Sequence, residues 1–196
     1  MKRLAIRAMV LSVLGLGAAA AVSFADLPSD DPRVQVRAAI EDLSNHLNAK
    51  DVPNRAKKIV ADFDSCDIST FFAAKRGGGF GIGSLAKNQN QDSVPYLLIQ
   101  LDRRKDITEK ELDDKQADFA RVAKGLQAMA QLAPFRGKPF TRGNEKKEKA
   151  WADVSADFQA KSAAFRTAVE ERDPKKVRLT AGALNQLCNA CHILRD

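Results

Sequence analysis

The sequence predicts an all-α protein, an antiparallel four-helix bundle with a glycine-rich insertion after its first helical segments. Two observations lead to this fold class. Ala and Lys are plentiful relative to Val and Ile, which favours helices over strands. Apolar residues also recur at every third or fourth position through several long stretches. Long helices joined by short loops pack as antiparallel bundles, and 196 residues suffice for one domain with a substantial core.

The first helical segments follow a proline start. Asp31 supplies an N-cap residue and Pro32 a first-turn proline, and apolar residues at helical spacing continue to about residue 50. Val52-Pro53 then interrupts the pattern. A second, short helix is expected over residues 54–63.

Residues 64–107 are predicted to form a loop or insertion in the bundle. The apolar segment from Tyr96 to Leu101 is expected to be either a short strand or a helical turn. The glycine run Gly77–Gly83 matches neither G-x-G-x-x-G nor a P-loop, which needs a following Gly-Lys-Ser/Thr. It therefore predicts a mobile or tightly turned loop rather than a nucleotide site. A loop that lies over a cofactor is a separate interpretation.

Three longer helices are expected downstream. Thr108 and Glu111 form a capping box for an amphipathic helix that ends before Pro134. The next helix follows a loop rich in Pro and Gly that extends to Asn144. The last helix starts at Asp173-Pro174, a second N-cap and proline pair, and runs to the C-terminus.

Residues 1–25 are predicted to be a secretory signal peptide. They begin with Lys2-Arg3, continue through an apolar stretch and end in a small-x-small triplet at Ala25, where cleavage is expected. A transmembrane anchor is one alternative, but the uncharged stretch over 8–22 is shorter than the roughly 20 residues of a span. A lipidated start is another, but no Cys stands at the cleavage site. We therefore expect residues 26–196 to form one periplasmic or secreted helical domain without a membrane span.

The charge of the chain does not indicate nucleic-acid binding. Removal of Lys2, Arg3 and Arg7 with the signal peptide lowers the formal charge from +7 to +4, and no aromatic residues interleave with the basic ones as a stacking platform requires. The basic clusters 146–149 and 175–178 are expected to be solvated faces. Docking of an acidic redox partner is the alternative for both clusters.

The strongest motif is the C-x-x-C-H sequence of Cys188, Cys191 and His192, the signature of covalent c-type haem attachment. Two thiols add across the porphyrin vinyl groups, and the adjacent imidazole reaches the iron. On a helix, spacings of three and four residues place all three side chains on one side. This side continues the inward apolar stripe of the last helix, so the motif is expected to face the core. The sequence thus predicts one covalently attached haem c.

Two other uses of the cysteines fit less well. A thioredoxin-like dithiol sits at a helix N-terminus, where the dipole lowers the thiol pKa, whereas this pair is expected in the last turns of a helix. A structural zinc site needs about four ligands, and only Cys66 and His46 remain in the chain. Cys66 is expected to be a buried or half-buried thiol without an assigned role.

A haem c on the last helix of a four-helix bundle resembles the class II c-type cytochromes, the cytochrome c′ family. The resemblance runs from about Leu126 to the C-terminus and is weaker in the first helix, with 64–107 as an insertion. It implies that Cys188 and Cys191 form the thioether links and that His192 is the fifth iron ligand. The family usually carries an Arg four residues after the haem His, whereas Arg195 stands one place nearer. The residues that carry the resemblance are Ala130-Gln131-Leu132, Trp151, Phe158, Phe165, Val169, Asp173, Val177, Ala181, Leu187 and the motif itself.

The sequence does not identify the sixth iron ligand. Six-coordinate members of the family place a Met on the first helix, but the only Met after residue 25 is Met129, on the second long helix. His46, on the first helix, is the other candidate. The alternative for His46 is a boundary histidine at the solvent edge, and the alternative for Met129 is a core side chain. The aliphatic stripe Val36–Leu47 would then form the distal wall.

Three functions follow from this reading. The first is electron transfer with a redox partner protein. The second is a five-coordinate haem protein that binds NO or CO, and the third is a secreted helical binding module without haem. None of them is an enzyme, and a homodimer is compatible with each.

Overall fold

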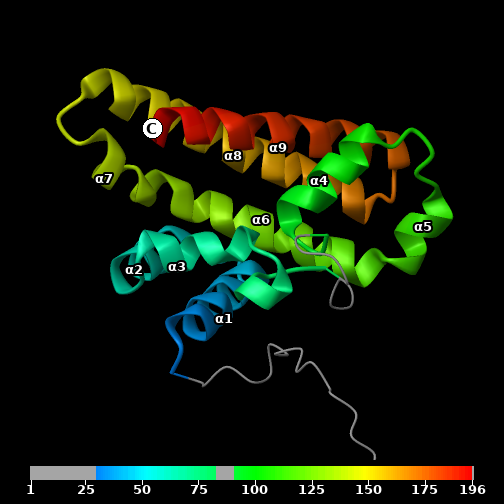
Figure 1. Ribbon diagram of the computed structural model, residues 1–196, viewed down its shortest axis with the longest axis horizontal. Helices are drawn as coiled ribbons and strands as arrows, with labels where there is room; N and C mark the ends of the chain where they lie inside the picture. The colour runs from blue at the N-terminus through cyan, green and yellow to red at the C-terminus, as the bar shows by residue number, and fades with distance from the viewer. Residues whose placement is uncertain (1–29, 83–90, 196) are drawn as a thin grey trace, which may run out of the picture.

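The computed structural model describes residues 30–82 and 91–195, and this part of the chain consists of helices and connecting turns without a strand (Figure 1). The all-α prediction is therefore confirmed. The predicted signal peptide lies outside the described residues. The α-helices are α1 Pro32–Asn45, α2 Val52–Asp62, α3 Ser65–Ser69, α4 Val94–Arg103, α5 Glu109–Asp114, α6 Gln116–Arg136, α7 Lys138–Thr141, α8 Glu145–Glu170 and α9 Pro174–Arg195, with short 3₁₀ turns at Thr70–Phe72 and Lys75–Gly77.

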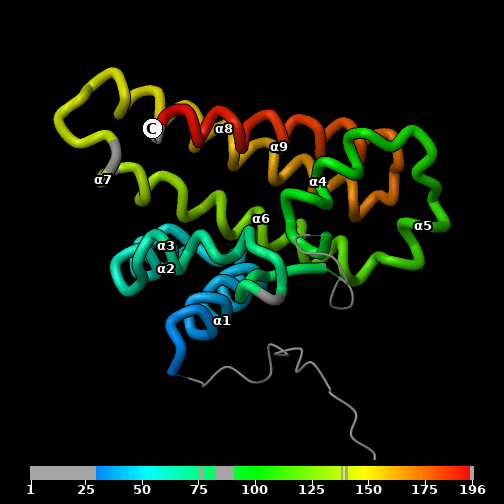
Figure 2. Tube along the Cα trace, viewed as in Figure 1, coloured from blue at the N-terminus to red at the C-terminus, as the bar shows by residue number. Residues whose placement is uncertain are grey.

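The three longest helices, α6, α8 and α9, run antiparallel in chain order, and α8 packs along both of the others (Figure 2). Helix α4 packs on α9, whereas α1 and α2 pack on α6. In Figure 1, α6 therefore lies between α9 on one side and α1, α2 and α3 on the other. The first helix is not a neighbour of the last one.

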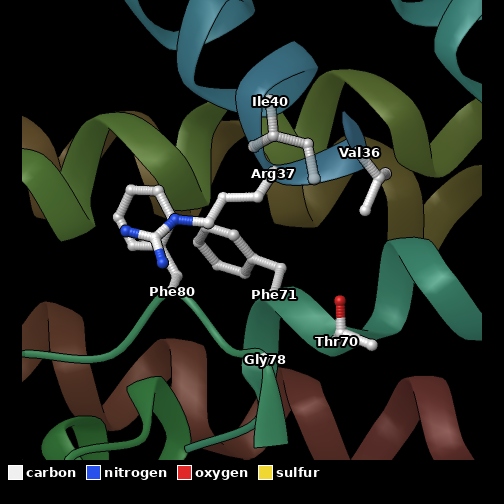
Figure 3. A pocket seen from close by; sticks show the side chains of 7 residues that line it. All are labelled: Val36, Arg37, Ile40, Thr70, Phe71, Gly78 and Phe80. Atoms are coloured by element: carbon white, nitrogen blue, oxygen red, sulfur yellow. The ribbon is translucent and has the colours of Figure 1, made fainter. Parts of the chain in front are cut away.

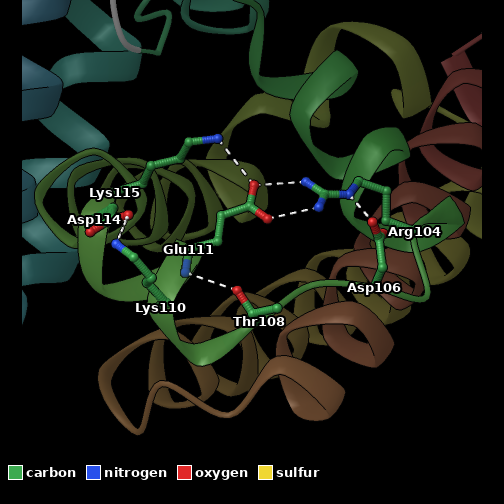
Figure 4. Close-up of polar contacts among 7 residues, drawn as sticks. All are labelled: Arg104, Asp106, Thr108, Lys110, Glu111, Asp114 and Lys115. Carbon is green, nitrogen blue, oxygen red and sulfur yellow. Dashed lines mark hydrogen bonds and ion pairs between the residues drawn. The ribbon is translucent and has the colours of Figure 1, made fainter.

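The predicted helix starts are present in the structure. The carboxylate of Asp31 accepts a hydrogen bond from the Arg33 backbone N–H at 2.8 Å, and Pro32 opens α1. The Thr108 hydroxyl accepts from the Glu111 N–H at 3.1 Å. The Glu111 carboxylate does not complete the capping box, because it forms a bidentate pair with Arg104 at 2.7 Å for both contacts (Figure 4).

Two sequence expectations about helix extent are wrong. Tyr96–Leu101 is neither a strand nor a single turn but the middle of α4, a ten-residue helix that Ser93 caps by accepting from the Tyr96 N–H. Residues 64–82 also hold α3 and two 3₁₀ turns. The expected insertion therefore contributes a helix that packs along α9.

Helix α6 also runs through Pro134 instead of ending before it. A proline inside a helix leaves the carbonyl four residues earlier without its N–H donor, here that of Ala130. The side-chain amide of Gln159 on α8 donates to the Ala130 carbonyl at 3.4 Å. One turn on, the indole N–H of Trp151 donates to the Ala133 carbonyl at 2.8 Å. Side chains of α8 thus replace backbone hydrogen bonds that the last turn of α6 lacks.

The described part of the glycine run is a tight turn that carries Phe80 into the core. Gly78 and Gly81 have φ of 88° and 55°, a region that favours glycine. The Phe80 ring is buried between α1 and Phe71 (Figure 3). Arg121 of α6 fixes the turn by donating to the carbonyls of Phe80 and Gly81 at 3.1 and 2.7 Å. Gly83 lies outside the described residues.

We predict that Gly79→Ala destabilises the fold, because a Cβ at this position would lie 1.7 Å from the Ala73 carbonyl oxygen. A backbone atom cannot move aside cheaply, so the free energy of unfolding should fall by about 3 kcal/mol, the upper end of typical overpacking. Gly77→Ala is the matched control, because its Cβ would meet the Ala73 Cβ at an ordinary 3.6 Å. Urea unfolding of both variants measures the difference. Equal midpoints for the two variants would contradict this account of the turn.

Candidate functional site

Helix α9 is positioned by one apolar stripe and one close contact. Asp173 caps the helix by accepting from the Lys176 N–H at 3.0 Å. Gly182 is buried, and a Cβ there would lie 2.4 Å from Asp102 Oδ1 of α4, so its lack of a side chain allows α4 to approach. These contacts fix the rotation of α9 about its axis. The buried stripe comprises Val177, Ala181, Leu184 and Leu187.

The C-x-x-C-H motif occupies the last two turns of α9, where the same face gradually loses its cover. Leu184 is 1% exposed, Cys188 and Cys191 are half-buried, and His192 is exposed. The motif therefore lies on the same face of α9 as the buried stripe. It is at the end of α9 where the neighbouring helices no longer cover this face, and not inside the core.

An apolar residue of α8 lies at the level of the two thiols. Phe158 precedes the end of α8 at Glu170 by twelve residues, and Cys188 follows the start of α9 at Pro174 by fourteen. At 1.5 Å per residue, these positions are about 18 and 21 Å from the α8–α9 turn. Phe158 is half-buried, so apolar surface is available beside Cys188.

The two motif thiols are held in their neutral form. Burial raises the pKa of Cys188 from an ordinary 9 to about 11, with a smaller contribution from Cys191. Burial also raises the pKa of Cys191, and the guanidinium of Arg136 opposes this shift. A redox dithiol needs a lowered thiol pKa, which is the opposite of what the site provides. A thioether sulfur carries no proton, so the same half-buried setting suits it.

Arg136, at the end of α6, contacts α3. Its Nη2 donates to the Ser65 carbonyl at 3.0 Å and to Ser69 Oγ at 2.8 Å, both on α3. Burial lowers the pKa of the Arg136 guanidinium, and the thiols of Cys191 and Cys66 oppose this shift. The sequence offered no signal for Arg136 beyond a basic residue near a helix end.

The other sequence candidates lie elsewhere or differ from expectation. His46 is exposed at the end of α1, where its Nδ1 lies 2.8 Å from the Asp42 carbonyl oxygen. Since α6 stands between α1 and α9 (Figure 1), the structure does not bring His46 to the motif. Met129 is buried in the core on α6. Cys66 is exposed, not buried or half-buried as the sequence suggested, and none of the three cysteines forms a disulfide.

The stripe of α1 that was expected to form a distal wall is already covered. Val36, Ile40 and Leu43 are each at most 1% exposed, and α1 packs on α6, α2 and α3. Phe71 and Phe80 line a small pocket together with residues of this stripe, Val36 and Ile40 (Figure 3). This stripe therefore belongs to a part of the core that lies away from α9.

Comparison of the chain with protein-family models, with curated proteins and with solved structures gave no match. Within the described residues, no group of three or more His, Cys, Asp or Glu side chains could hold a metal ion. No helix in the described part of the chain is long and apolar enough to cross a membrane.

We predict that the thiol of Cys188 in the haem-free protein reacts slowly with iodoacetamide at pH 8. The thiolate is the reactive form, and burial raises the Cys188 pKa to about 11, so its alkylation rate should keep rising between pH 9 and 11. Peptide mass spectrometry gives the rate at each cysteine, with exposed Cys66 and urea-unfolded protein as controls. A Cys188 rate that levels off below pH 9 would show that burial does not control this thiol.

Proposed function

We propose that this chain is a c-type haem protein in which one haem c is linked to Cys188 and Cys191, with His192 as an axial iron ligand. The observation that carries the proposal is the C-x-x-C-H motif on a regular helix, with both thiols on the face that continues the apolar stripe of α9. The resemblance to class II c-type cytochromes supports the same assignment.

The residues at the end of α9 suit this cofactor. Cys188 and Cys191 are half-buried and form no disulfide, so both thiols are free for thioether formation. The His192 ring is exposed, and no residue in the described part of the chain hydrogen-bonds to it, so its nitrogen is free for iron. Phe158, half-buried at the level of the thiols, offers apolar surface to a macrocycle. Bound haem would supply a one-electron couple at the iron.

We also propose a four-helix bundle, but with a different set of helices from the one that the sequence suggested. Helices α6, α8 and α9 would be three of its members, and α4, which packs on α9, would be the fourth. In the sequence-based expectation, the first helix filled this place.

The charged surface suggests where a redox partner docks. Lys146, Lys147 and Lys149 begin α8, at the end of the molecule where α9 finishes (Figure 1). The other basic cluster, 175–178, begins α9 and is about 20 Å along the helix from Cys188. Its Lys176 is already paired with Glu171 at 2.6 Å. Electron transfer to an acidic partner therefore favours the start of α8 as the docking surface.

Binding of NO or CO is the second candidate function, and the position of His46 favours it. The imidazole of His46 is engaged by Asp42, at 2.8 Å from its carbonyl and 3.3 Å from its carboxylate, on the far side of α6 from α9 (Figure 1). A haem without a second protein ligand would be five-coordinate and open to small gases.

Covalent attachment is tested with the protein produced together with a cytochrome c maturation system. The wild type should keep its haem through acid–acetone extraction, because thioether bonds survive the loss of the fold. The double variant Cys188→Ser and Cys191→Ser should release all of it, whereas Cys66→Ser should behave as the wild type. Retention of haem by the double variant would disprove the attachment site.

Axial ligation is tested by absorbance spectra of the ferrous protein with and without CO. We expect a high-spin spectrum that changes on addition of CO and that His46→Ala leaves unaltered, because His46 lies away from the motif. A low-spin spectrum that converts to high-spin in His46→Ala would instead establish bis-histidine ligation. That result would remove the support for gas binding.

A further inference from the structure

Two open grooves of similar volume, about 540 and 550 Å³, adjoin each other at the end of the molecule where α4 ends, α5 follows and α8 turns into α9 (Figure 1). Pro174, the first residue of α9, lines both grooves. We call the first one the basic groove; it is lined by Arg104, Lys105, Ile107, Pro174, Lys175 and Arg178. We call the second one the acidic groove; it is lined by Glu109, Asp113, Glu171, Arg172, Asp173 and Pro174.

The basic groove carries cations that the fold leaves unpaired. Two basic runs that are far apart in the chain, 103–105 and 175–178, meet there because α4 packs on α9. The Arg104 guanidinium is already bound by a carboxylate through two bonds of 2.7 Å (Figure 4). In contrast, Lys105, Lys175 and half-buried Arg178 form no ion pair with a described residue, and no carboxylate lines the groove.

The acidic groove has the opposite charge. Four of its lining residues are acids, and Arg172 is the one cation among them. Arg172 pairs with Asp113 at 3.1 Å, and Glu171 pairs with Lys176 at 2.6 Å. Glu109 is exposed and forms no ion pair within the described part of the chain. An excess of negative charge therefore adjoins an excess of positive charge, with Pro174 between them.

Neighbouring patches of opposite charge form a surface that is complementary to itself. In a twofold dimer every contact occurs twice, because a residue of one copy that meets a second residue of the other copy also receives the reverse contact. A twofold axis at Pro174 brings the basic groove of each copy against the acidic groove of the other. Isolated exposed ion pairs contribute little, whereas a network of several charges contributes more. The cations that one copy leaves unpaired gain carboxylates in such a dimer.

We propose that this chain forms a twofold homodimer in which the basic groove of each copy receives the acidic groove of the other. Exposed charges hold this dimer, so salt weakens it by screening them. Cys188 follows Pro174 by fourteen residues, about 21 Å along α9. The dimer therefore leaves the C-x-x-C-H motif uncovered, and its formation does not depend on haem.

The test is the molar mass of the purified protein by sedimentation equilibrium, at low ionic strength and in about 1 M NaCl, where the screening length is roughly 3 Å. The wild type should be a dimer at low ionic strength and a monomer at high salt. Lys105→Glu with Lys175→Glu reverses the basic groove, and Glu109→Lys with Glu171→Lys reverses the acidic one. In either double variant like charges face each other, so the dissociation constant should rise at least about a hundredfold.

An equimolar mixture of the two double variants gives the sharpest result. Their reversed charges complement each other in both contacts of a heterodimer, so the mixture should associate at low ionic strength although neither variant does so alone. Lys50→Glu with Lys57→Glu is the matched control. It makes the same change of charge on two exposed lysines at α2, at the other end of the molecule (Figure 1), and should dimerise as the wild type does.

Each outcome decides the proposal. A wild type that stays monomeric at low ionic strength up to millimolar concentration overturns it and leaves an acidic partner protein as the occupant of the basic groove. A dimer that withstands high salt, or that both groove variants still form, is held by another surface. A mixture that stays monomeric, although both variants keep the wild-type circular dichroism spectrum, refutes the pairing of the grooves. Loss of the dimer in the control shows that net charge alone governs association and also refutes it. If a double variant does not fold, Lys105→Glu and Glu109→Lys replace the pairs in the same comparison.

Discussion

Burial of the apolar stripe of α9 is the constraint on which the candidate site depends. Val177, Ala181 and Leu184 are almost fully buried, and α9 packs on α8 and α4. A helix held along about two turns cannot rotate about its axis, so the direction of Cys188, Cys191 and His192 is set by the packing of the preceding part of α9. The last two turns lose their cover, which leaves the motif facing inward yet accessible. A covalent cofactor needs this combination of fixed direction and access.

The molecule divides into two regions that share α6. One face of α6 packs against α8, whose Gln159 and Trp151 bond to carbonyls at its C-terminal end. The other face packs against α1, α2 and the glycine turn. The Phe80 side chain of this turn is buried, and Arg121 donates hydrogen bonds to the carbonyls of Phe80 and Gly81. At the end of α6, Arg136 ties this helix to α3 by donating to the Ser65 carbonyl.

Local signals in the sequence predicted where helices begin better than they predicted which helices pack against each other. The caps at Asp31, Thr108 and Asp173 could be predicted, because a cap depends on residues within three positions. Helix α4 was missed, since its apolar residues form one short run that fits a strand or a helical turn equally well, and its burial comes from contact with α9. The continuation of α6 through Pro134 was also missed, because it depends on hydrogen bonds from side chains of α8. The motif itself was recognisable because its spacing is local, whereas the contact of Arg136 with α3 arises only through the tertiary fold.

The central claim is that Cys188 and Cys191 hold a haem, and the mass of the denatured intact protein tests it most directly. After production with a cytochrome c maturation system, the account predicts a mass that exceeds the polypeptide by one haem, with the added mass on the peptide that contains residues 188–192. A polypeptide of unmodified mass, with both thiols open to alkylation after unfolding, would contradict it.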